Sequence, residues 1–141
     1  MLRHGDAEDG SPDAARRLTA KGERHSRAAG AALAQLGVRL DACLTSPRVR
    51  AADTARLACE SLGLEAGEDE RLAGGAFDPR ELAAGLGAEV LLVGHEPDLS
   101  EAVRGVTGGH VKMKKGGLAA MVDGELRLLL GPNELARIAG H

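Results

Sequence analysis

The amino-acid sequence predicts an α/β domain with three layers, in which helices cover both faces of a mostly parallel sheet. Segments of helical periodicity alternate with short apolar runs, which is the pattern of strand–helix–strand units. The run 90–93 is continuously apolar, as expected for a strand that is buried on both faces. The 141 residues contain no internal repeat, low-complexity tract or linker, so we expect one domain that spans residues 1–141.

The first half of the chain is predicted to contain two helices separated by a buried strand. Thr19 is a suitable N-cap for a helix through AKGERHSRAAGAALAQL, which stops at Gly37. The apolar run ACLTS at 42–46 predicts a buried strand, and Pro47 turns the chain after it. A second amphipathic helix is expected in RVRAADTARLACESLG, which ends at Gly63.

The middle of the chain is more polar and less periodic. The stretch from Glu65 to Gly75 contains several charged residues and glycines, so it is predicted to be a loop. Asp78 is the expected cap of a third helix, with Pro79 in its first turn and its end near Gly87.

The last third of the chain is predicted to form a strand, a helix, a hairpin and a short final helix. EVLLVG is the strongest predicted strand, and a helix follows it with Pro97 or Asp98 near its start. LAAMV and ELRLLL flank Asp123-Gly124, the type of dipeptide that favours a tight hairpin turn. PNELARIAG then closes the chain as a short helix.

The composition excludes several classes of protein. The 18 basic and 21 acidic side chains give a formal net charge of -3, so we expect no binding to nucleic acid or to an anionic membrane. Cys43 and Cys59 lack CxxC spacing and paired histidines, which predicts buried free thiols in a reducing cytoplasm. No apolar run approaches about 18 residues and no signal-peptide pattern is present, so we expect a cytoplasmic protein.

Three predicted strands end in polar residues that can bind an anion. The three polar segments are Arg3-His4-Gly5, Pro47-Arg48-Val49-Arg50 and His95-Glu96-Pro97. Ligands bind where loops leave the carboxyl ends of parallel strands, so we expect two histidines and two or three arginines to meet there. Guanidinium groups and helix N-termini bind phosphate oxygens, and Gly5 allows the backbone to approach a ligand closely. The cluster therefore predicts a site for a small dianion such as phosphate.

Four segments of the chain also carry a family resemblance. LRHGDA, LTAKG, TSPRVRAADTA and VGHEPDL resemble, in this order, the motifs of the histidine phosphatase superfamily, which includes phosphoglycerate mutases and acid phosphatases. KKGGLA at 114–119 is similar to the small bacterial SixA-like phosphohistidine phosphatases, and the short chain lacks a cap insertion after the second arginine motif. The resemblance implies a phosphoglycerate mutase-like fold and the SixA-like branch.

The resemblance assigns roles to four residues. His4 is implied to be the nucleophile that becomes phosphorylated, Arg3 and Arg50 to bind the phosphoryl oxygens, and His95 to complete the pocket. A cationic surrounding disfavours protonation of an imidazole, so the arginines that bind substrate are also expected to keep His4 nucleophilic. Arg48 falls where the family does not require a basic residue, so we expect it to face the surface or the substrate.

The general acid is left open by the sequence. Asp6 is a candidate, and the other candidate carboxyl groups are Asp69, Glu70, Asp78 and Glu81. A phosphohistidine substrate would relax the demand for an acid, because a protonated imidazole leaves more easily than an alkoxide. The scheme needs no metal and no cofactor, and the carboxylates offer no convincing set of metal ligands.

The remaining polar residues have simpler interpretations. The basic run Lys112, Lys114 and Lys115 is either a solvated face or a loop that attracts an acidic protein partner. We expect no catalytic role for four further residues, which are His25, Thr54, His110 and His141.

The first strand is expected to be short. Only three residues precede His4, whereas a strand typically has about five or six residues. Either the strand is truncated in this chain or its true start lies upstream, and a truncated strand would hold Arg3 and His4 less firmly.

The leading hypothesis is a metal-independent phosphatase that acts through a phosphohistidine intermediate on a phosphohistidine protein. One alternative is a phosphatase or mutase of small sugar or glycolytic phosphates. A second alternative is a module that binds a phosphorylated partner without turnover, although such a module needs the arginines and no nucleophile such as His4.

Overall fold

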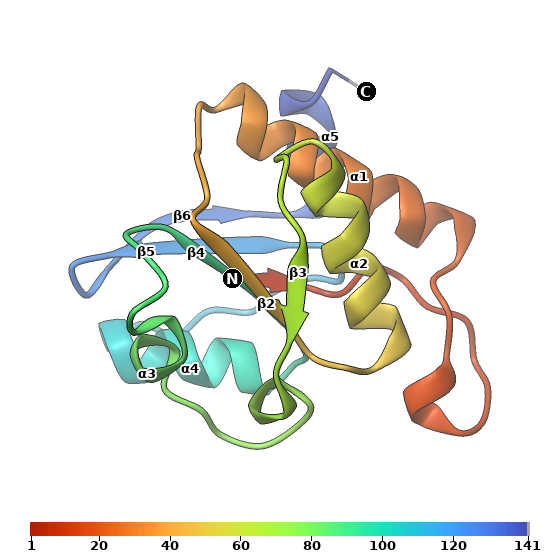
Figure 1. Cartoon of the computed structure of the whole chain (residues 1–141), viewed down its shortest axis with the longest axis horizontal. Coiled ribbons are helices and arrows are strands. Elements are labelled where there is room, and N and C mark those ends of the chain that lie inside the picture. Colours follow the sequence, from red (N-terminus) through yellow and green to blue (C-terminus); the bar gives the residue numbers. More distant parts are fainter. Residues whose placement is uncertain (141) are drawn as a thin grey trace.

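The computed structural model describes residues 1–140 and consists of a six-stranded sheet with helices on both faces, as Figure 1 shows. His141 lies outside the described residues. The strands are β1 (Leu2–Arg3), β2 (Ala42–Thr45), β3 (Ala66–Glu68), β4 (Val90–Gly94), β5 (Leu118–Val122) and β6 (Glu125–Leu130). The helices are α1 (Ala20–Gln35), α2 (Val49–Glu60), α3 (Pro79–Ala83), α4 (Asp98–Thr107) and α5 (Pro132–Ile138), with 3-10 turns η1 (Asp13–Ala15) and η2 (Glu70–Leu72).

The sheet is mostly parallel, as the sequence predicts. Its strand order is β3-β2-β4-β1-β5-β6, and the four strands from β3 to β1 are parallel to one another. β5 is antiparallel to β1 and β6 is antiparallel to β5. The adjacent strands β2, β4 and β1 are the three whose ends carry the predicted site residues, so their carboxyl ends meet at one edge.

Two apolar cores lie on opposite faces of the sheet, which gives the predicted three layers. Because successive side chains of a strand point to opposite faces, Leu91 and Val93 of β4 pack in one core and Leu92 packs in the other. Helices α1, α2 and α5 contribute to the first core, and α3 and α4 contribute to the second. Figure 1 shows these two groups of helices on opposite sides of the sheet.

The ends of several elements follow the local signals in the sequence. The Thr19 side chain accepts a hydrogen bond from the Gly22 backbone N–H and starts α1, and Asp78 caps α3 in the same way. Asp123 and Gly124 both have positive φ, at 51° and 78°, which is the conformation of a tight hairpin turn between β5 and β6. The predicted caps and the predicted hairpin are confirmed.

The stretch from Glu65 to Gly75 is not a plain loop, so that prediction is wrong. It contains β3 and η2, and Asp69 caps η2 by accepting a hydrogen bond from the Arg71 backbone N–H. The sequence of β3, Ala-Gly-Glu, has low intrinsic strand preference, and pairing with the edge of β2 determines its conformation. The third helix is also shorter than expected, because α3 already ends at Ala83.

The N-terminal strand is short, as the sequence predicts, and it lies in the middle of the sheet. β1 has two residues and pairs with β4 on one side and β5 on the other. The Met1 amino group donates a hydrogen bond of 2.6 Å to the Ala119 carbonyl, and burial lowers its pKa to about 5. The neutral amino group is therefore more stable at this buried position than the charged ammonium group.

Two further predictions concern the apolar interior. Cys43 and Cys59 are both buried free thiols, as expected. Within residues 1–140, none of the helices is long and apolar enough to cross a bilayer.

Candidate active site

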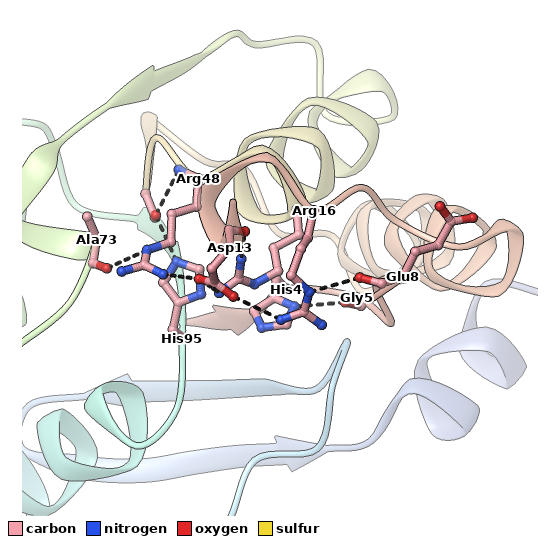
Figure 2. Close-up of polar contacts among 10 residues, drawn as sticks. His4, Gly5, Glu8, Asp13, Arg16, Arg48, Ala73 and His95 are labelled. Atoms are coloured by element: carbon pink, nitrogen blue, oxygen red, sulfur yellow. Dashed lines mark hydrogen bonds and ion pairs between the residues drawn. The ribbon is translucent and has the colours of Figure 1, made fainter. Parts of the chain in front are cut away.

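The ends of β1, β2 and β4 bring His4, Arg50 and His95 together at the carboxyl edge of the sheet. The imidazole rings of His4 and His95 have centroids 5.2 Å apart and are tilted by 51°. His4, Arg50 and His95 are only 7%, 6% and 8% exposed. Figure 2 shows the two rings side by side beneath Asp13 and two arginines. The predicted convergence of these residues is therefore confirmed.

His4 is fixed by its own backbone and by one ring nitrogen. Its backbone N–H donates to the Gly94 carbonyl at 3.1 Å, and its carbonyl accepts from the Gly116 N–H at 2.9 Å. The ring Nδ1 lies 2.8 Å from the Gly5 carbonyl. A carbonyl oxygen only accepts, so Nδ1 carries the hydrogen and Nε2 of the neutral ring keeps a free lone pair.

Burial, together with the charges of Arg50, Arg3 and Lys115, lowers the pKa of His4 to about 4, against the opposing effect of the Gly5 hydrogen bond. The imidazole is therefore neutral at neutral pH, which is the state that can attack phosphorus.

The turn after His4 is held by hydroxyl groups and by glycines. The Gly5 N–H donates to Thr54 Oγ1 at 3.0 Å, and that hydroxyl donates to the Arg50 carbonyl at 2.7 Å. A Cβ on Gly5 would lie 2.8 Å from the Gly22 carbonyl oxygen. Gly5 was expected to allow close approach to a ligand, and the structure shows that its missing side chain makes room for the backbone of α1. Thr54 fixes the turn, in addition to the packing role that the sequence predicts.

His95 is held by one nitrogen, like His4. Its Nε2 lies 2.8 Å from Ser46 Oγ, at the end of β2. Its Nδ1 is buried and has no hydrogen-bond partner among the residues that the structure describes. Burial, together with the neighbouring His4 and Arg50, lowers the pKa of His95 to about 3.

Arg3 and Arg50 are each held through the end of the guanidinium group. Arg3 Nη1 donates to the Met113 carbonyl at 2.9 Å, and burial lowers the pKa of Arg3. Arg50 Nη1 donates to the Asp13 carbonyl at 2.9 Å, and its Nη2 lies 3.2 Å from Asp13 Oδ2. The Nε atoms of both arginines are buried and find no acceptor within residues 1–140.

In each of the four residues, the protein binds one or two nitrogens and leaves another nitrogen unbound. The free atoms are His4 Nε2, His95 Nδ1, Arg3 Nε and Arg50 Nε. A buried polar atom without a partner is costly, so three such nitrogens in one cluster indicate a ligand with several acceptor oxygens. Two permanent positive charges make that ligand an anion. The geometry fits a phosphoryl group attacked by His4 Nε2.

Three of the five candidate general acids lie in surroundings that favour the ionised form. Asp6 Oδ2 accepts from Thr19 Oγ1 at 2.9 Å and its Oδ1 lies 3.6 Å from Lys115 Nζ, and both interactions lower its pKa. Asp69 and Asp78 are bound by neighbouring arginines, which lower the pKa of each carboxyl group. The two remaining candidates, Glu70 and Glu81, are exposed on η2 and α3.

The residues of the basic run separate at this edge. All three lysines are exposed, but Lys115 also reaches Asp6 and lies close enough to His4 to affect its pKa. Lys115 therefore belongs to the rim of the site. Within residues 1–140, no three histidine, cysteine or carboxylate side chains gather closely enough to hold a metal ion.

Sequence reasoning missed Asp13. Its carboxylate contacts Arg16, Arg48 and Arg50, and Figure 2 shows it between Arg48 and Arg16. The polar stretch around Asp13 has no periodicity, and an acidic residue among arginines was the one available signal. Arg48, expected at the surface or facing the substrate, lies beside Arg50 and also donates through Nε to the Ala73 carbonyl at 2.8 Å.

Comparison with known proteins identifies the family. Residues 1–82 match the family model of the histidine phosphatase superfamily (branch 1). The chain belongs to the histidine phosphatase superfamily. An uncharacterised protein from Picosynechococcus sp. is 37% identical over 91% of this chain and 86% of its own length.

Solved structures agree with this assignment. The protein histidine phosphatase SixA complexed with tungstate has a TM-score of 0.81 and 27% identity, over 95% of this chain and 96% of that chain. A candidate SixA from Agrobacterium tumefaciens shares the fold at 22% identity and a TM-score of 0.71, over 84% of this chain and 86% of that chain. A candidate α-ribazole-5′-P phosphatase from Escherichia coli shares the fold at 19% identity and a TM-score of 0.74, over 93% of this chain and 95% of that chain. The phosphoglycerate mutase-like fold and the SixA-like resemblance are confirmed.

Proposed function

We propose that this protein is a metal-independent phosphatase that forms a phosphohistidine on His4 and that its substrate is a phosphohistidine in a protein. The observation that carries the proposal is the shared arrangement of His4, His95, Arg3 and Arg50. The protein holds each of them through one or two nitrogens, and it leaves buried nitrogens of His95, Arg3 and Arg50 without a partner among residues 1–140.

In the first step, the lone pair of His4 Nε2 attacks phosphorus, and the bond from phosphorus to the leaving group breaks as the new P–N bond forms. Arg3 and Arg50 bind the phosphoryl oxygens, where positive charge stabilises the transition state. The hydrogen bond from Nδ1 to the Gly5 carbonyl keeps Nε2 aimed at phosphorus and stabilises the positive charge that the ring gains.

In the second step, water attacks the phosphoryl group on His4. The P–O bond forms as the P–N bond to Nε2 breaks, which releases inorganic phosphate and restores the neutral imidazole. His95 Nδ1 contacts a phosphoryl oxygen in both steps, and Ser46 holds the ring through Nε2. Three candidate acids, Asp6, Asp69 and Asp78, are each bound to a lysine or arginine, so a leaving group that departs without a strong acid suits this protein.

Support for a phosphohistidine protein comes from two observations. The similarity to the protein histidine phosphatase SixA extends over 95% of this chain, with a TM-score of 0.81. The rim of the site also carries basic residues that can attract an acidic protein surface, including Arg16, Arg48 and Lys115. A phosphorylated imidazole leaves readily once its other nitrogen is protonated, so this substrate does not require one of the candidate carboxyl groups to act as a strong acid.

The test is to trap the intermediate and compare substrates. Purified protein is mixed with a phosphohistidine-containing protein labelled on phosphorus, quenched in alkali, and mapped by peptide mass spectrometry. We expect the label on His4, its loss in His4→Ala, and its retention in the matched control His110→Ala, since His110 is an exposed histidine.

Turnover of an aryl phosphate and of 3-phosphoglycerate by the same preparation distinguishes the substrate classes. Faster turnover of the small esters than of the phosphohistidine protein would show that the substrate is a small phosphate ester and not a protein. Binding of phosphorylated protein without any labelling or release of phosphate would show a binding module in place of an enzyme.

A further inference from the structure

We propose that Asp13 is a positioning residue that orients the guanidinium group of Arg50 for phosphoryl binding. This inference rests on the proposed function, because it concerns how the phosphoryl site is assembled. Asp13 lies outside the four family motifs, and its side chain is 51% exposed.

The first argument is the way in which Asp13 meets Arg50. Arg50 Nη1 donates to the Asp13 carbonyl at 2.9 Å, and Nη2 lies 3.2 Å from Asp13 Oδ2. A guanidinium group has five N–H donors in a plane, and these two contacts use only its terminal nitrogens. The buried Nε, which shares an edge with Nη2, is left to bind a phosphoryl oxygen. Asp13 therefore fixes the end of the group and leaves a side edge for the ligand.

The second argument is that Arg3 is held in the same way. Its Nη1 donates to the Met113 carbonyl and its Nε is buried without an acceptor in the described part of the chain. In both arginines a protein oxygen binds the terminal nitrogen and Nε remains. Asp13 therefore does for Arg50 what the Met113 backbone does for Arg3, with a carboxylate charge added.

The third argument is the concentration of positive charge around Asp13. Its carboxylate bonds to Arg48 and lies 3.1 Å from Arg16 Nη1 as well as 3.2 Å from Arg50. Guanidinium groups this close repel one another, and a shared carboxylate offsets the repulsion. Without that charge, Arg48 and Arg50 would separate and Arg50 would lose its fixed orientation.

The segment that carries Asp13 has little else to keep it in place. The 3-10 turn η1 has no buried residue, so polar contacts rather than apolar packing hold it against α2. Bonds to Arg16, Arg48 and Arg50 lower the pKa of Asp13, which keeps it ionised. An ionised carboxylate cannot donate a proton to a leaving group, so the geometry favours positioning over general acid catalysis.

The experiment compares Asp13→Asn with Asp13→Glu and with a matched control on the same helix as Arg50. Asp53→Asn makes the same change in charge and removes a surface ion pair to Arg56 at 3.6 Å. The dissociation constant of inorganic phosphate is measured by calorimetry, and kcat and KM are measured with an aryl phosphate across pH. Thermal unfolding of each variant checks that it is folded.

We expect Asp13→Asn to weaken phosphate binding about tenfold, the effect of losing one charged hydrogen bond. KM should rise by a similar factor, kcat should change less, and the pH profile should keep its shape. Asp13→Glu should restore part of the affinity, and Asp53→Asn should resemble the wild type. These outcomes would separate positioning from a structural role, because stability alone does not shift KM selectively.

Three results would overturn the inference. Tighter phosphate binding in Asp13→Asn would show that the carboxylate competes with the ligand for Arg50. Unchanged binding would show that Arg50 needs no carboxylate, and loss of one limb of the pH profile would show that Asp13 transfers a proton. Failure of the wild-type protein to bind phosphate and to turn over any phosphate substrate would instead overturn the proposed function, and this inference with it.

Discussion

Acidification tests the electrostatic description of the site through folding stability. The folded pKa values of His4 and His95 are lowered from 6.5 to about 4 and about 3 by burial and by the neighbouring positive charges. In the unfolded chain both rings take up a proton below about pH 6.5. Between that pH and about pH 4 the unfolded state therefore binds more protons than the folded state, and acidification favours unfolding.

The size of the effect follows from the two shifts. Each histidine contributes about 1.4 kcal/mol per pH unit to the loss of stability in this range. The shift of His4 from 6.5 to about 4 corresponds to about 3 kcal/mol over the whole range, a large fraction of the stability of a small domain. If neutral His4 is the nucleophile, as proposed, activity should persist in the folded fraction until the pH approaches about 4.

The assay is urea unfolding followed by circular dichroism from neutral pH down to about pH 4. The free energy of unfolding should fall more slowly with decreasing pH in His4→Gln and in His95→Gln, by about 1.4 kcal/mol per pH unit in each. The exposed His110 provides the control, since His110→Gln should keep the wild-type slope. Equal slopes in the wild type and both active-site variants would refute the lowered pKa values.

Three further outcomes can be checked by thermal unfolding and kinetics. Gly30→Ala should destabilise the fold by about 2 kcal/mol, because its Cβ would lie 1.9 Å from the Ala58 carbonyl oxygen, whereas Gly105→Ala in open space on α4 should stabilise it by about 1 kcal/mol. Extending the chain before Met1 with two apolar residues should raise the melting temperature. The added residues would lie beside positions of β4 that β1 leaves unpaired, and the buried amino group of Met1 would become an amide. An unchanged melting temperature would contradict this expectation. Lys115→Glu should reduce kcat/KM severalfold for an acidic phosphoprotein and less for an aryl phosphate, and equal effects on both would show that Lys115 does not face a protein partner.

Much of the fold follows from local signals that the chain carries. Thr19 and Asp78 accept hydrogen bonds from backbone N–H groups two or three residues away, and Asp123-Gly124 forms a tight turn. Because these interactions involve only neighbouring residues, the sequence alone predicts where they occur. The run 90–93 similarly identifies a strand that is covered on both faces. β3 escapes the same reasoning because its conformation is imposed by its neighbour β2 and not by its own residues.

The site was predictable in its members and less so in its geometry. Because the polar ends of β1, β2 and β4 follow apolar strands, their convergence is a consequence of a parallel sheet. Which nitrogen of His4 or Arg50 is free depends on acceptors such as Gly5 and Asp13, and those contacts exist only in the folded chain. Asp13 itself lies in a segment with no periodic pattern, so its contacts with three arginines could not be read from spacing.

The central place of β1 has a consequence for synthesis on the ribosome. His4 is among the first residues to emerge, yet its backbone is bound by Gly94 and Gly116, and Arg3 by Gly117. At translation rates of about 5–20 residues per second, the interval before those partners emerge is on the order of ten seconds. A growing chain therefore carries His4, the proposed nucleophile, for most of its synthesis before its backbone partners exist, so we expect phosphatase activity only once the chain has been made beyond Gly117.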